Sequence, residues 1–599
     1  MSPRSDSGTP DGTAEVQAAA EGAKLLLAVR GWIDQDPDQG DRDELRGLLE
    51  LVQDPSSPEQ RAQEAVADLA ERFGGTLRFG TAGLRAQLGA GPMRMNRAVV
   101  RRAAAGVAAH VLEAAGPDPA PRAVIGFDAR HRSADFARDT AAVLTAAGLS
   151  VELMPRPLPT PLLAWAVRSR GAEVGIMVTA SHNPAADNGY KVYLGGRCVD
   201  AAGQGCQIVP PHDEQIAQRI EAVGDLRELP LADHGWTTLP EDIDRQYLEA
   251  AVGAAPGEAS EPGLRIVLSA MHGVGGPTAL AALQRAGFDD VHPVPEQFEP
   301  DPEFPTAPFP NPEEPGALSL SLSLAREVDA DLVLANDPDA DRCAVAVPDA
   351  RDPRAVDGWR ALTGDEVGAL LGLAALRAAD GASDRPIVAN SIVSSRLLGR
   401  MAEAAGAAHR ETLTGFKWIA RVPGLVYGYE EALGYCVDPG TVRDKDGITA
   451  TVGIARLARA AAADGRTLLD ELDDLALRHG LHTASQLSIR VADLELIPAM
   501  MRALRESTPT ELAGSPVVSV DDLSQPDPGS GLLPTEGMRL LTEDGTRVVV
   551  RPSGTEPKLK CYLETVAGVG SADRLPGARQ AARERHDALT EQLRELFAA

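Results

Sequence analysis

A serine hydroxyl stands beside an imidazole in the segment Thr179-Ala180-Ser181-His182-Asn183-Pro184. The residues before it, 174–178, predict a short apolar strand. Because Asn-Pro favours a turn and proline cannot continue a central strand, we expect Ser181 to be exposed at the tip of a loop. A serine that accepts and donates a phosphoryl group needs such access. A structural serine in an Asn-Pro turn is the alternative interpretation.

Three aspartates at alternate positions, Asp337, Asp339 and Asp341, follow a second apolar run. A bent loop can bring three carboxylates onto one hard cation, and Mg²⁺ is typically bound by a few carboxylates together with phosphate oxygens. The spacing is not that of an EF-hand, because Arg342 and Pro348 occupy the positions that would need Gly and Glu. A solvated acidic turn is the alternative.

Two further segments carry groups suited to sugars and phosphates. Two carboxylates follow an apolar strand in the segment Tyr427-Gly428-Tyr429-Glu430-Glu431-Ala432-Leu433-Gly434. They could accept hydrogen bonds from sugar hydroxyls, although a Glu-Glu pair usually lies on the solvated surface. A guanidinium, two hydroxyls, a glycine and a lysine are combined in the segment Arg551-Pro552-Ser553-Gly554-Thr555-Glu556-Pro557-Lys558. That combination is typical of a phosphate site, and a surface turn is the alternative.

Alternating strands and helices would position these segments. Apolar runs predict strands at 123–127, 151–154, 174–178, 265–268, 331–335 and 386–390. Amphipathic patterns predict helices at 134–147, 161–169, 277–286, 365–378 and 395–405. This alternation indicates βαβ units with largely parallel sheets, whose ligand sites gather at the carboxyl ends of the strands. A hairpin around Glu543-Asp544-Gly545 and a long terminal helix indicate a different, α+β domain at the end of the chain.

The fold class is therefore α/β, with three similar α/β domains that have mixed, mostly parallel sheets, and a smaller C-terminal α+β domain. We expect a disordered tail over 1–20, followed by N-terminal helices and the first α/β domain over 21–225. The second and third α/β domains would cover 226–347 and 348–480, and the α+β domain 481–599. Two proline-rich segments, 295–315 and 525–534, are expected to be linkers.

Composition excludes several classes of partner. The 599 residues include 58 basic and 87 acidic side chains, a net charge of −29, which disfavours nucleic acid and anionic membranes. The chain has no run of ~18 apolar residues and no apolar segment at its start that would indicate a signal peptide. Five scattered cysteines without metal-ligand spacing favour reduced thiols and a cytoplasmic protein. A phosphorylated substrate would therefore need a local basic pocket.

In order and separation, the four chemical segments together resemble those of the α-D-phosphohexomutase family. Shorter matches lie at 79–85, 126–130, 362–366, 412–418 and 444–447, so that the resemblance runs from about 78 to 564. It implies four domains around a central cleft, bound Mg²⁺ and a small-molecule sugar phosphate as substrate. The implied reaction interconverts the 1-phosphate and 6-phosphate of glucose or mannose, with glucose 1,6-bisphosphate or mannose 1,6-bisphosphate as activator and intermediate.

The resemblance also implies roles for individual residues. Metal binding falls to Asp337, Asp339, Asp341 and Ser181, which would carry the transferable phosphate. The reaction centre would contain Arg85, His182, Lys191 and Lys445. Substrate binding would involve Arg342, Glu430, Glu431, Arg551, Ser553, Gly554, Thr555 and Lys558.

One position departs from the common family pattern. Ala432 stands where many members have a serine, so one hydrogen-bonding group toward the sugar is missing. The resulting Glu-Glu-Ala-x-Gly form is similar to a branch of larger mutases that includes phosphopentomutase and glucose-bisphosphate-forming enzymes. Pentose phosphates therefore stay open as an alternative, as do a metal-dependent sugar phosphatase and a non-catalytic sugar-phosphate sensor. The sequence leaves open the choice between monomer and homodimer, and between Lys445 and His182 as general acid or base.

Overall fold

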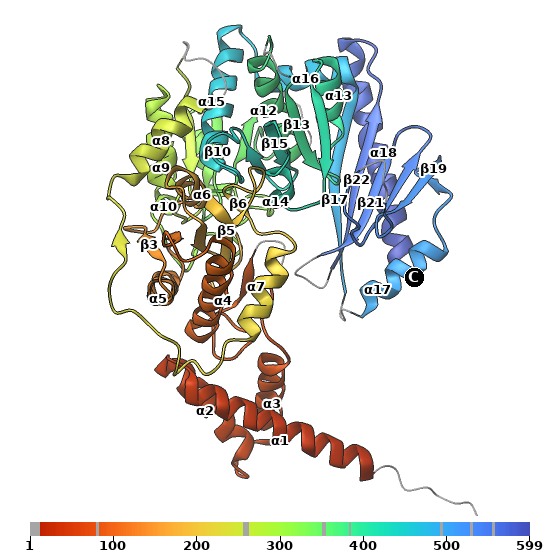
Figure 1. The fold of residues 1–599 in the computed structure, drawn as a ribbon. Helices are drawn as coiled ribbons and strands as arrows, with labels where there is room; N and C mark the ends of the chain where they lie inside the picture. Colours follow the sequence, from red (N-terminus) through yellow and green to blue (C-terminus); the bar gives the residue numbers. More distant parts are fainter. Residues whose placement is uncertain are drawn as a thin grey trace, which may run out of the picture.

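The computed structural model describes residues 12–79, 83–254, 263–349, 355–381, 385–491, 495–526, 531–553 and 558–598. Within these ranges, the chain forms four sheets, one for each of four successive stretches of sequence. Figure 1 shows the C-terminal sheet at one side of the three α/β units and three N-terminal helices projecting from their base. The expected fold class is confirmed.

The first α/β unit has the strand order β1-β5-β4-β2-β3-β7, with β6 paired to β5. Its parallel part comprises β2, β3, β4 and β7, whereas β5 runs antiparallel to both β4 and β1. The strands are β1 (Leu84–Gln87), β2 (Arg122–Phe127), β3 (Ser150–Leu153), β4 (Val174–Val178), β5 (Asp187–Leu194), β6 (Cys206–Gln207) and β7 (Thr237–Thr238). The helices are α4 (Arg97–Ala115), α5 (Ser133–Ala146), α6 (Thr160–Ser169) and α7 (His212–Glu221).

The second and third α/β units repeat this plan with fewer strands, in the orders β12-β11-β10-β8-β9 and β14-β13-β15-β16. The second unit contains α8 (Ile243–Ala254), β8 (Ile266–Ser269), α9 (Gly276–Arg285), β9 (Val291–Pro293), α10 (Pro295–Phe298), α11 (Ser319–Glu327), β10 (Leu332–Ala335), β11 (Ala344–Pro348) and β12 (Trp359–Ala361). The third contains α12 (Gly364–Ala378), β13 (Ile387–Ser391), α13 (Leu397–Ala404), β14 (Ala408–Thr412), α14 (Phe416–Ile419), β15 (Leu425–Glu430), β16 (Gly434–Cys436), α15 (Gly447–Ala463) and α16 (Leu468–His479).

The C-terminal unit is an antiparallel sheet in the order β17-β22-β21-β20-β19-β18, packed on α18. The predicted hairpin around Glu543-Asp544-Gly545 is confirmed, because it joins β20 and β21. The elements are β17 (Leu481–Arg490), α17 (Leu496–Glu506), β18 (Glu511–Leu512), β19 (Ser515–Asp522), β20 (Met538–Thr542), β21 (Arg547–Pro552), β22 (Lys558–Ala567) and α18 (Leu575–Ala598).

The four chemical segments occupy equivalent places in the four sheets. Each one connects a strand to an antiparallel neighbour, in the pairs β4–β5, β10–β11, β15–β16 and β21–β22. In the α/β units, the first strand of each pair also lies in the parallel part of its sheet. The strand that follows turns back beside it, so the connecting loop stays short and close to the sheet edge. A single topological position therefore carries all four loops.

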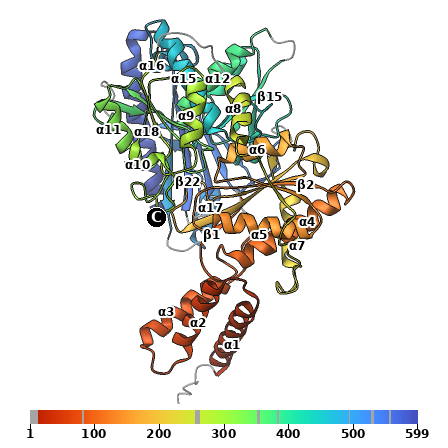
Figure 2. The same ribbon diagram turned by 90° about the vertical axis from the view of Figure 1, so that its left-hand side faces the viewer.

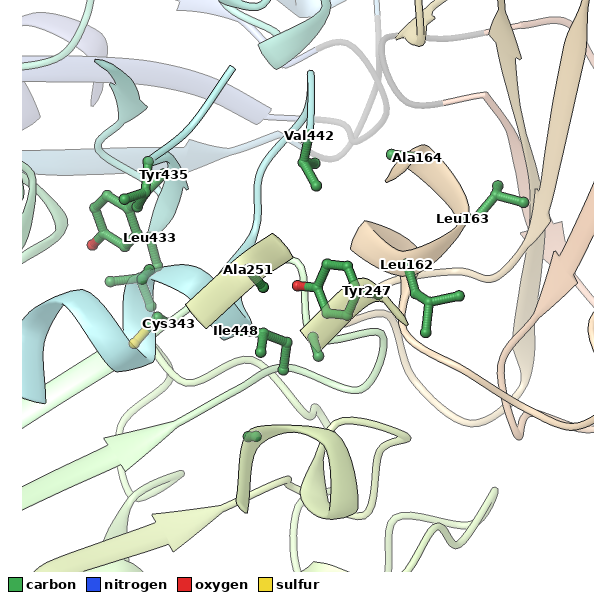
Figure 3. Close-up of a cluster of buried hydrophobic side chains, with 14 of the residues drawn as sticks. Leu162, Leu163, Ala164, Tyr247, Ala251, Cys343, Leu433, Tyr435, Val442 and Ile448 are labelled. Atoms are coloured by element: carbon green, nitrogen blue, oxygen red, sulfur yellow. The ribbon is translucent and has the colours of Figure 1, made fainter. Parts of the chain in front are cut away.

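A shared apolar core holds the three α/β units together. Figure 3 shows Leu162 of α6, Tyr247 of α8, and Leu433 and Tyr435 of the third unit among the side chains of this cluster. These four side chains are almost completely buried. Because the core is continuous across the three units, their loops are held in fixed relative positions.

The N-terminal helices α1 (Gly12–Gln35), α2 (Gln39–Gln53) and α3 (Glu59–Phe73) pack against the start of α4 and project away from the sheets (Figure 2). The first two helices end just before Asp36-Pro37 and Asp54-Pro55. The expected disordered tail over 1–20 is wrong for its second half, because α1 begins at Gly12. Alanines at 14 and 18–20 explain the difference, since alanine has the highest helix propensity.

The two proline-rich segments are not linkers between domains. The segment 295–315 lies between β9 and α11 inside the second unit, where Phe304 and Ala307 are buried. The segment 525–534 joins β19 to β20 inside the C-terminal sheet, and its residues 527–530 lie outside the described ranges. Proline favours extended chain as well as flexible boundaries, so composition alone could not distinguish these roles.

No helix in the described ranges is both long and apolar enough to cross a membrane. All five cysteines are buried, and none is in a disulfide. Burial raises the pKa of the Cys343 thiol to about 12, which agrees with a core residue rather than a reactive one.

A buried carboxylate fastens the C-terminal sheet to the third unit. Glu564 of β22 accepts hydrogen bonds from Ser395 Oγ at 2.8 Å and Arg396 Nε at 2.6 Å, and His482 Nδ1 lies 2.9 Å away. Burial by itself would raise the pKa of Glu564, but Arg547, His482 and Arg396 hold this pKa well below its usual range. The ionised form is thus favoured by folding.

Replacing Glu564 with Gln should therefore destabilise the folded protein by about 3 kcal/mol at pH 7, because two arginines lose their buried counter-charge. A carboxylate with a depressed folded pKa contributes its full stability above the ordinary value of 4.5 and loses it as the pH falls below that value. The difference in Tm between E564Q and the natural protein should consequently shrink between pH 7 and pH ~4.

Glu591→Gln, in an exposed pair with Arg594, is the matched control. An equal difference at both pH values would show that the charge is not responsible.

Candidate active site

The four loops line one cavity of about 1620 Å³ between the α/β units and the C-terminal sheet. Residues that the sequence predicted for the site and that line this cavity are Arg85, His182, Arg342, Glu430, Glu431, Lys445, Arg551, Ser553 and Lys558. Gly554 and Thr555, also predicted for the site, lie outside the described residues. The cavity is large enough for a sugar bearing two phosphates, since typical ligand sites measure ~300–1,000 Å³.

Ser181 lies at the turn between β4 and β5 in a left-handed conformation, with φ of 53°. Its Oγ donates a hydrogen bond to Asp337 Oδ2 at 3.0 Å, and His182 Nδ1 lies 3.4 Å away. The expected exposure is wrong, because Ser181 is only 2% exposed. The loop that carries Asp337 in the second unit covers Ser181, and this contact between distant segments cannot be read from the sequence. A serine held with positive φ at a loop tip indicates a functional constraint.

Arg130 is a functional residue to which the sequence analysis gave no role. Its buried guanidinium pairs with Asp128 and lies 4.9 Å from the ring of Phe304. It donates hydrogen bonds to four carbonyl oxygens of the serine loop, those of Ser181 (2.7 Å), Asn183 (2.5 Å), Pro184 (2.7 Å) and Asp187 (3.1 Å). One planar, charged guanidinium thus fixes the backbone from Ser181 to Asp187. The signal in the sequence was the polar Asp128 and Arg130 directly after a buried strand.

Asp337, Asp339 and Asp341 are buried with ligand oxygens all within 4.8 Å of one another. Two lysines from other units contact them. Lys191 Nζ of β5 lies 2.7 Å from Asp339 Oδ2 and 2.9 Å from Asp341 Oδ2, and Lys445 Nζ lies 3.1 Å from Asp341 Oδ2. The predicted residues are therefore brought together from three units.

The aspartate cluster fits a divalent cation. Asp339 Oδ1 and Asp341 Oδ1 are buried, and neither has a hydrogen-bond partner among the described residues. Burial and repulsion from Asp341 raise the pKa of both Asp337 and Asp339. Burial also opposes ionisation of Asp341, but Lys191, Lys445 and Arg342 hold its pKa below the usual range. Carboxylates confined in this way favour additional positive charge, and a hard cation with oxygen ligands supplies it.

The loop that carries Glu430 and Glu431 contacts the loop that carries the three aspartates. Arg342 donates a hydrogen bond to the carbonyl of Ala432, and Cys343 N donates to Leu433 O at 3.2 Å. Gly447, which begins α15, lies so close that an added Cβ would be 2.3 Å from Arg342 O. This close approach explains the glycine in the 444–447 segment.

The two glutamates of this loop face different partners. Glu430 Oε1 accepts a hydrogen bond from Gly415 N at 2.6 Å, and burial together with Glu431 raises its pKa. Glu431 Oε2 instead accepts from Ser394 Oγ at 2.8 Å and from Ser391 Oγ at 3.1 Å. One carboxylate oxygen of each glutamate is thus engaged within the protein.

Lys445 is held by residues from the first unit that the sequence gave no reason to select. Tyr193 Oη donates to Asp444 Oδ2 at 2.6 Å, and Gln207 Nε2 donates to the same oxygen at 2.7 Å. Asp444 is separated from Tyr193 by 251 positions, and its Oδ1 lies 3.4 Å from Lys445 Nζ. Only the folded chain reveals this contact.

Four family models, each described as phosphoglucomutase/phosphomannomutase, match the chain in order. Alpha/beta/alpha domains I, II and III match residues 76–227, 245–350 and 363–476, and the C-terminal domain matches 488–575. Together they cover most of the described chain.

Individual relatives agree with this assignment. A probable phosphomannomutase of Haemophilus influenzae is 44% identical over 79% of this chain and 93% of its own length. The phosphopentomutase of Homo sapiens is 35% identical over 84% of this chain and 87% of its own. A crystal structure of a putative phosphomannomutase from Thermus thermophilus superposes with a TM-score of 0.65 at 26% identity, covering 88% of this chain and 100% of the other.

The hydrogen bonds from Arg130 to the loop that carries Ser181 can be tested without a substrate. Arg130→Lys should speed amide hydrogen exchange in residues 179–187 by about 10- to 100-fold, because an ammonium cannot keep four carbonyl hydrogen bonds. Arg122→Lys is the matched control, since its exposed guanidinium donates to Arg170 O at 3.1 Å outside this loop. Unchanged exchange in R130K would mean that the loop holds its shape without this guanidinium.

Proposed function

The chain belongs to the phosphoglucomutase/phosphomannomutase family, and we propose that it interconverts the 1-phosphate and 6-phosphate of a hexose through a phosphorylated Ser181. The reaction class is that of an isomerase acting as an intramolecular phosphotransferase. The observation that carries the proposal is the placement of the Ser181 hydroxyl 3.0 Å from Asp337, directly beside His182, which lines the same cavity as Arg551, Ser553 and Lys558. A nucleophile thus lies behind one wall of the cavity, and a second anion site lies on another.

The second anion site favours a mutase over a phosphatase. A phosphatase needs one place for the phosphate that it removes, next to its nucleophile. A mutase must hold a second phosphate while the first one is transferred, and then accept the two in exchanged positions. Arg551 and Lys558, together with Ser553, provide such a place on the C-terminal sheet.

In the proposed reaction, phosphorylated Ser181 donates its phosphoryl group to the free hydroxyl of the bound monophosphate. The bond between Ser181 Oγ and phosphorus breaks as the bond between the sugar oxygen and phosphorus forms, and the hydroxyl proton leaves to a base. The bisphosphate then reverses its orientation in the cavity, and its other phosphate returns to Ser181. Arg85 lies in the cavity beside Asn183, to which it donates a hydrogen bond at 2.8 Å, and would neutralise charge on the transferring group.

His182 and Lys445 are the groups proposed to move the proton. His182 Nδ1 lies 3.4 Å from Ser181 Oγ, and Lys445 lines the same cavity from the third unit. Burial, with Arg342 and Arg85 nearby, lowers the pKa of His182 well below its ordinary value, which favours the neutral imidazole and makes it a weak base.

Asp337, Asp339 and Asp341 would hold Mg²⁺ together with an oxygen of phosphorylated Ser181. When bound, the cation would stabilise negative charge on the transferring phosphoryl group. Lys191 and Lys445 would keep the remaining carboxylate charge in balance, since both already contact this cluster.

A pentose phosphate is the second candidate substrate. It is favoured by the 35% identity to a phosphopentomutase and by Ala432, which removes a hydroxyl from the sugar loop.

A sugar bisphosphate, of glucose or mannose, would serve as the activator and intermediate with hexose substrates. The buried, unpaired cysteines agree with a cytoplasmic location.

The proposed role of Ser181 is tested by phosphorus NMR of the purified protein with Mg²⁺, a trace of glucose 1,6-bisphosphate, and separately glucose 1-phosphate, mannose 1-phosphate and ribose 1-phosphate. The natural protein should isomerise at least one substrate with little free phosphate, and Ser181→Ala should lower turnover by about 10⁴-fold or more. Ser169→Ala, exposed at the end of α6, should leave turnover unchanged. Near-normal turnover in S181A would overturn the scheme, and free phosphate without isomer would indicate a phosphatase.

The proposed metal site is tested by binding of Mn²⁺, followed by electron paramagnetic resonance. Asp339→Asn should weaken binding by at least about 100-fold, because the loss of an outer-shell partner alone commonly costs 10- to 100-fold. Asp329→Asn is the control, because Asp329 is exposed in the same unit with φ of 55°, which asparagine accepts. Equal Mn²⁺ affinity in D339N and D329N would exclude Asp339 as a ligand.

A further inference from the structure

A fifth segment lines the cavity in addition to the four loops. It is the proline-rich loop, defined here as residues 304–316, which connects α10 to α11 in the second unit. Phe309, Asn311, Glu313 and Glu314 of this loop all line the cavity. No role was expected for them, because the sequence analysis assigned this stretch to a linker.

The proline-rich loop is docked beside the nucleophile at two points. Phe304, which is 2% exposed, lies 4.9 Å from the guanidinium of Arg130, the residue that holds the serine loop. The rings of Phe309 and His182 are 6.3 Å apart, and His182 follows Ser181 directly. The loop is therefore built onto the reaction centre, and its prolines limit its freedom in the empty protein.

Phe309 and Glu313 offer complementary surfaces to a ligand. Phe309 remains 39% exposed, although it lies in the cavity. The backbone N–H of Glu313 donates to Asn311 Oδ1 at 3.2 Å, but its carboxylate has no hydrogen bond or ion pair with any residue in the described part of the chain. Glu313 is exposed to solvent within the cavity. The surrounding cleft walls and repulsion from Glu431 raise the pKa of its carboxyl, against the attraction of Arg342.

We propose that the proline-rich loop is a fifth substrate-binding loop, in which Glu313 accepts hydrogen bonds from sugar hydroxyls and Phe309 packs against the sugar ring. The inference rests on the proposed function, because it concerns the sugar of the same sugar phosphate. A sugar has hydroxyls along its edge and apolar C–H groups on its faces, which suit a carboxylate and an aromatic ring.

The chemistry of the neighbouring loop supports this assignment. Ala432 lacks the hydroxyl that a serine would supply, and one oxygen of Glu431 is engaged by Ser391 and Ser394. One oxygen of Glu430 is likewise engaged, by the backbone N–H of Gly415, so this loop offers few acceptors for several sugar hydroxyls. Glu313 supplies a further acceptor from the opposite unit.

The test compares Glu313→Gln with Glu299→Gln in the full-length protein, using the best substrate of the natural enzyme. Glu299 is the matched control, because it is exposed on the chain that leads into the proline-rich loop and does not line the cavity. If Glu313 binds hydroxyls, E313Q should raise KM by about 10- to 100-fold, and E299Q should leave it unchanged. If Glu313 only repelled the anionic substrate, removing its negative charge would lower KM. The change in KM in E313Q therefore has opposite signs for a Glu313 that binds hydroxyls and for one that acts only through its charge.

Inorganic phosphate provides the second readout, because it competes for the anion sites and carries no sugar hydroxyl. Its inhibition constant should stay the same or fall in E313Q, whereas a general collapse of the cavity would raise it. Phe309→Ala should raise KM for the sugar phosphate in the same selective way. An unchanged or lower KM in E313Q, or weaker inhibition by phosphate in parallel with KM, would overturn the inference. These outcomes are separate from failure of the proposed function, in which the natural protein would isomerise no sugar phosphate at all.

Discussion

The rest of the cleft depends on three buried carboxylates confined within 4.8 Å of one another. Burying one uncompensated charge is costly, and burying three together requires positive charge from several directions. Lys191 comes from the first unit and Lys445 from the third, while the aspartates belong to the second. Electrostatic compensation therefore joins three units at one point, and the Ser181 hydroxyl lies within hydrogen-bond distance of the same cluster.

The position of the loops follows from topology. In each unit, the chemical segment joins a strand to an antiparallel neighbour, and the shared apolar core orients three of these connections toward one another. The fourth comes from a sheet of a different kind, fastened by the buried Glu564 rather than by that core. The three α/β units thus form one firmly joined body, to which the C-terminal sheet is attached separately.

Basic side chains gather in the cavity of a protein that is acidic overall. The chain carries −29 overall, yet Arg85, Arg342, Lys445, Arg551 and Lys558 all line the cavity. An acidic exterior disfavours nonspecific binding to polyanions, whereas these basic side chains can attract a small anion into the cleft. The loss of water around these groups strengthens their interaction with such a ligand.

The sequence by itself determined the fold class, most strands and helices, and the identity of the four loops, because these depend on local periodicity and on residue types within short segments. It also identified several residues that line the cavity, among them His182, Glu430 and Arg551. It could not determine which atoms meet, since Lys191 and Asp339 are 148 positions apart and Tyr193 and Asp444 are 251 apart. The burial of Ser181, the four carbonyls held by Arg130 and the place of the proline-rich loop in the cleft were decided only by the tertiary structure. Each depends on contacts between segments that are far apart in the sequence, within one unit for Arg130 and between units for the others, and such contacts leave no periodic signal in either segment.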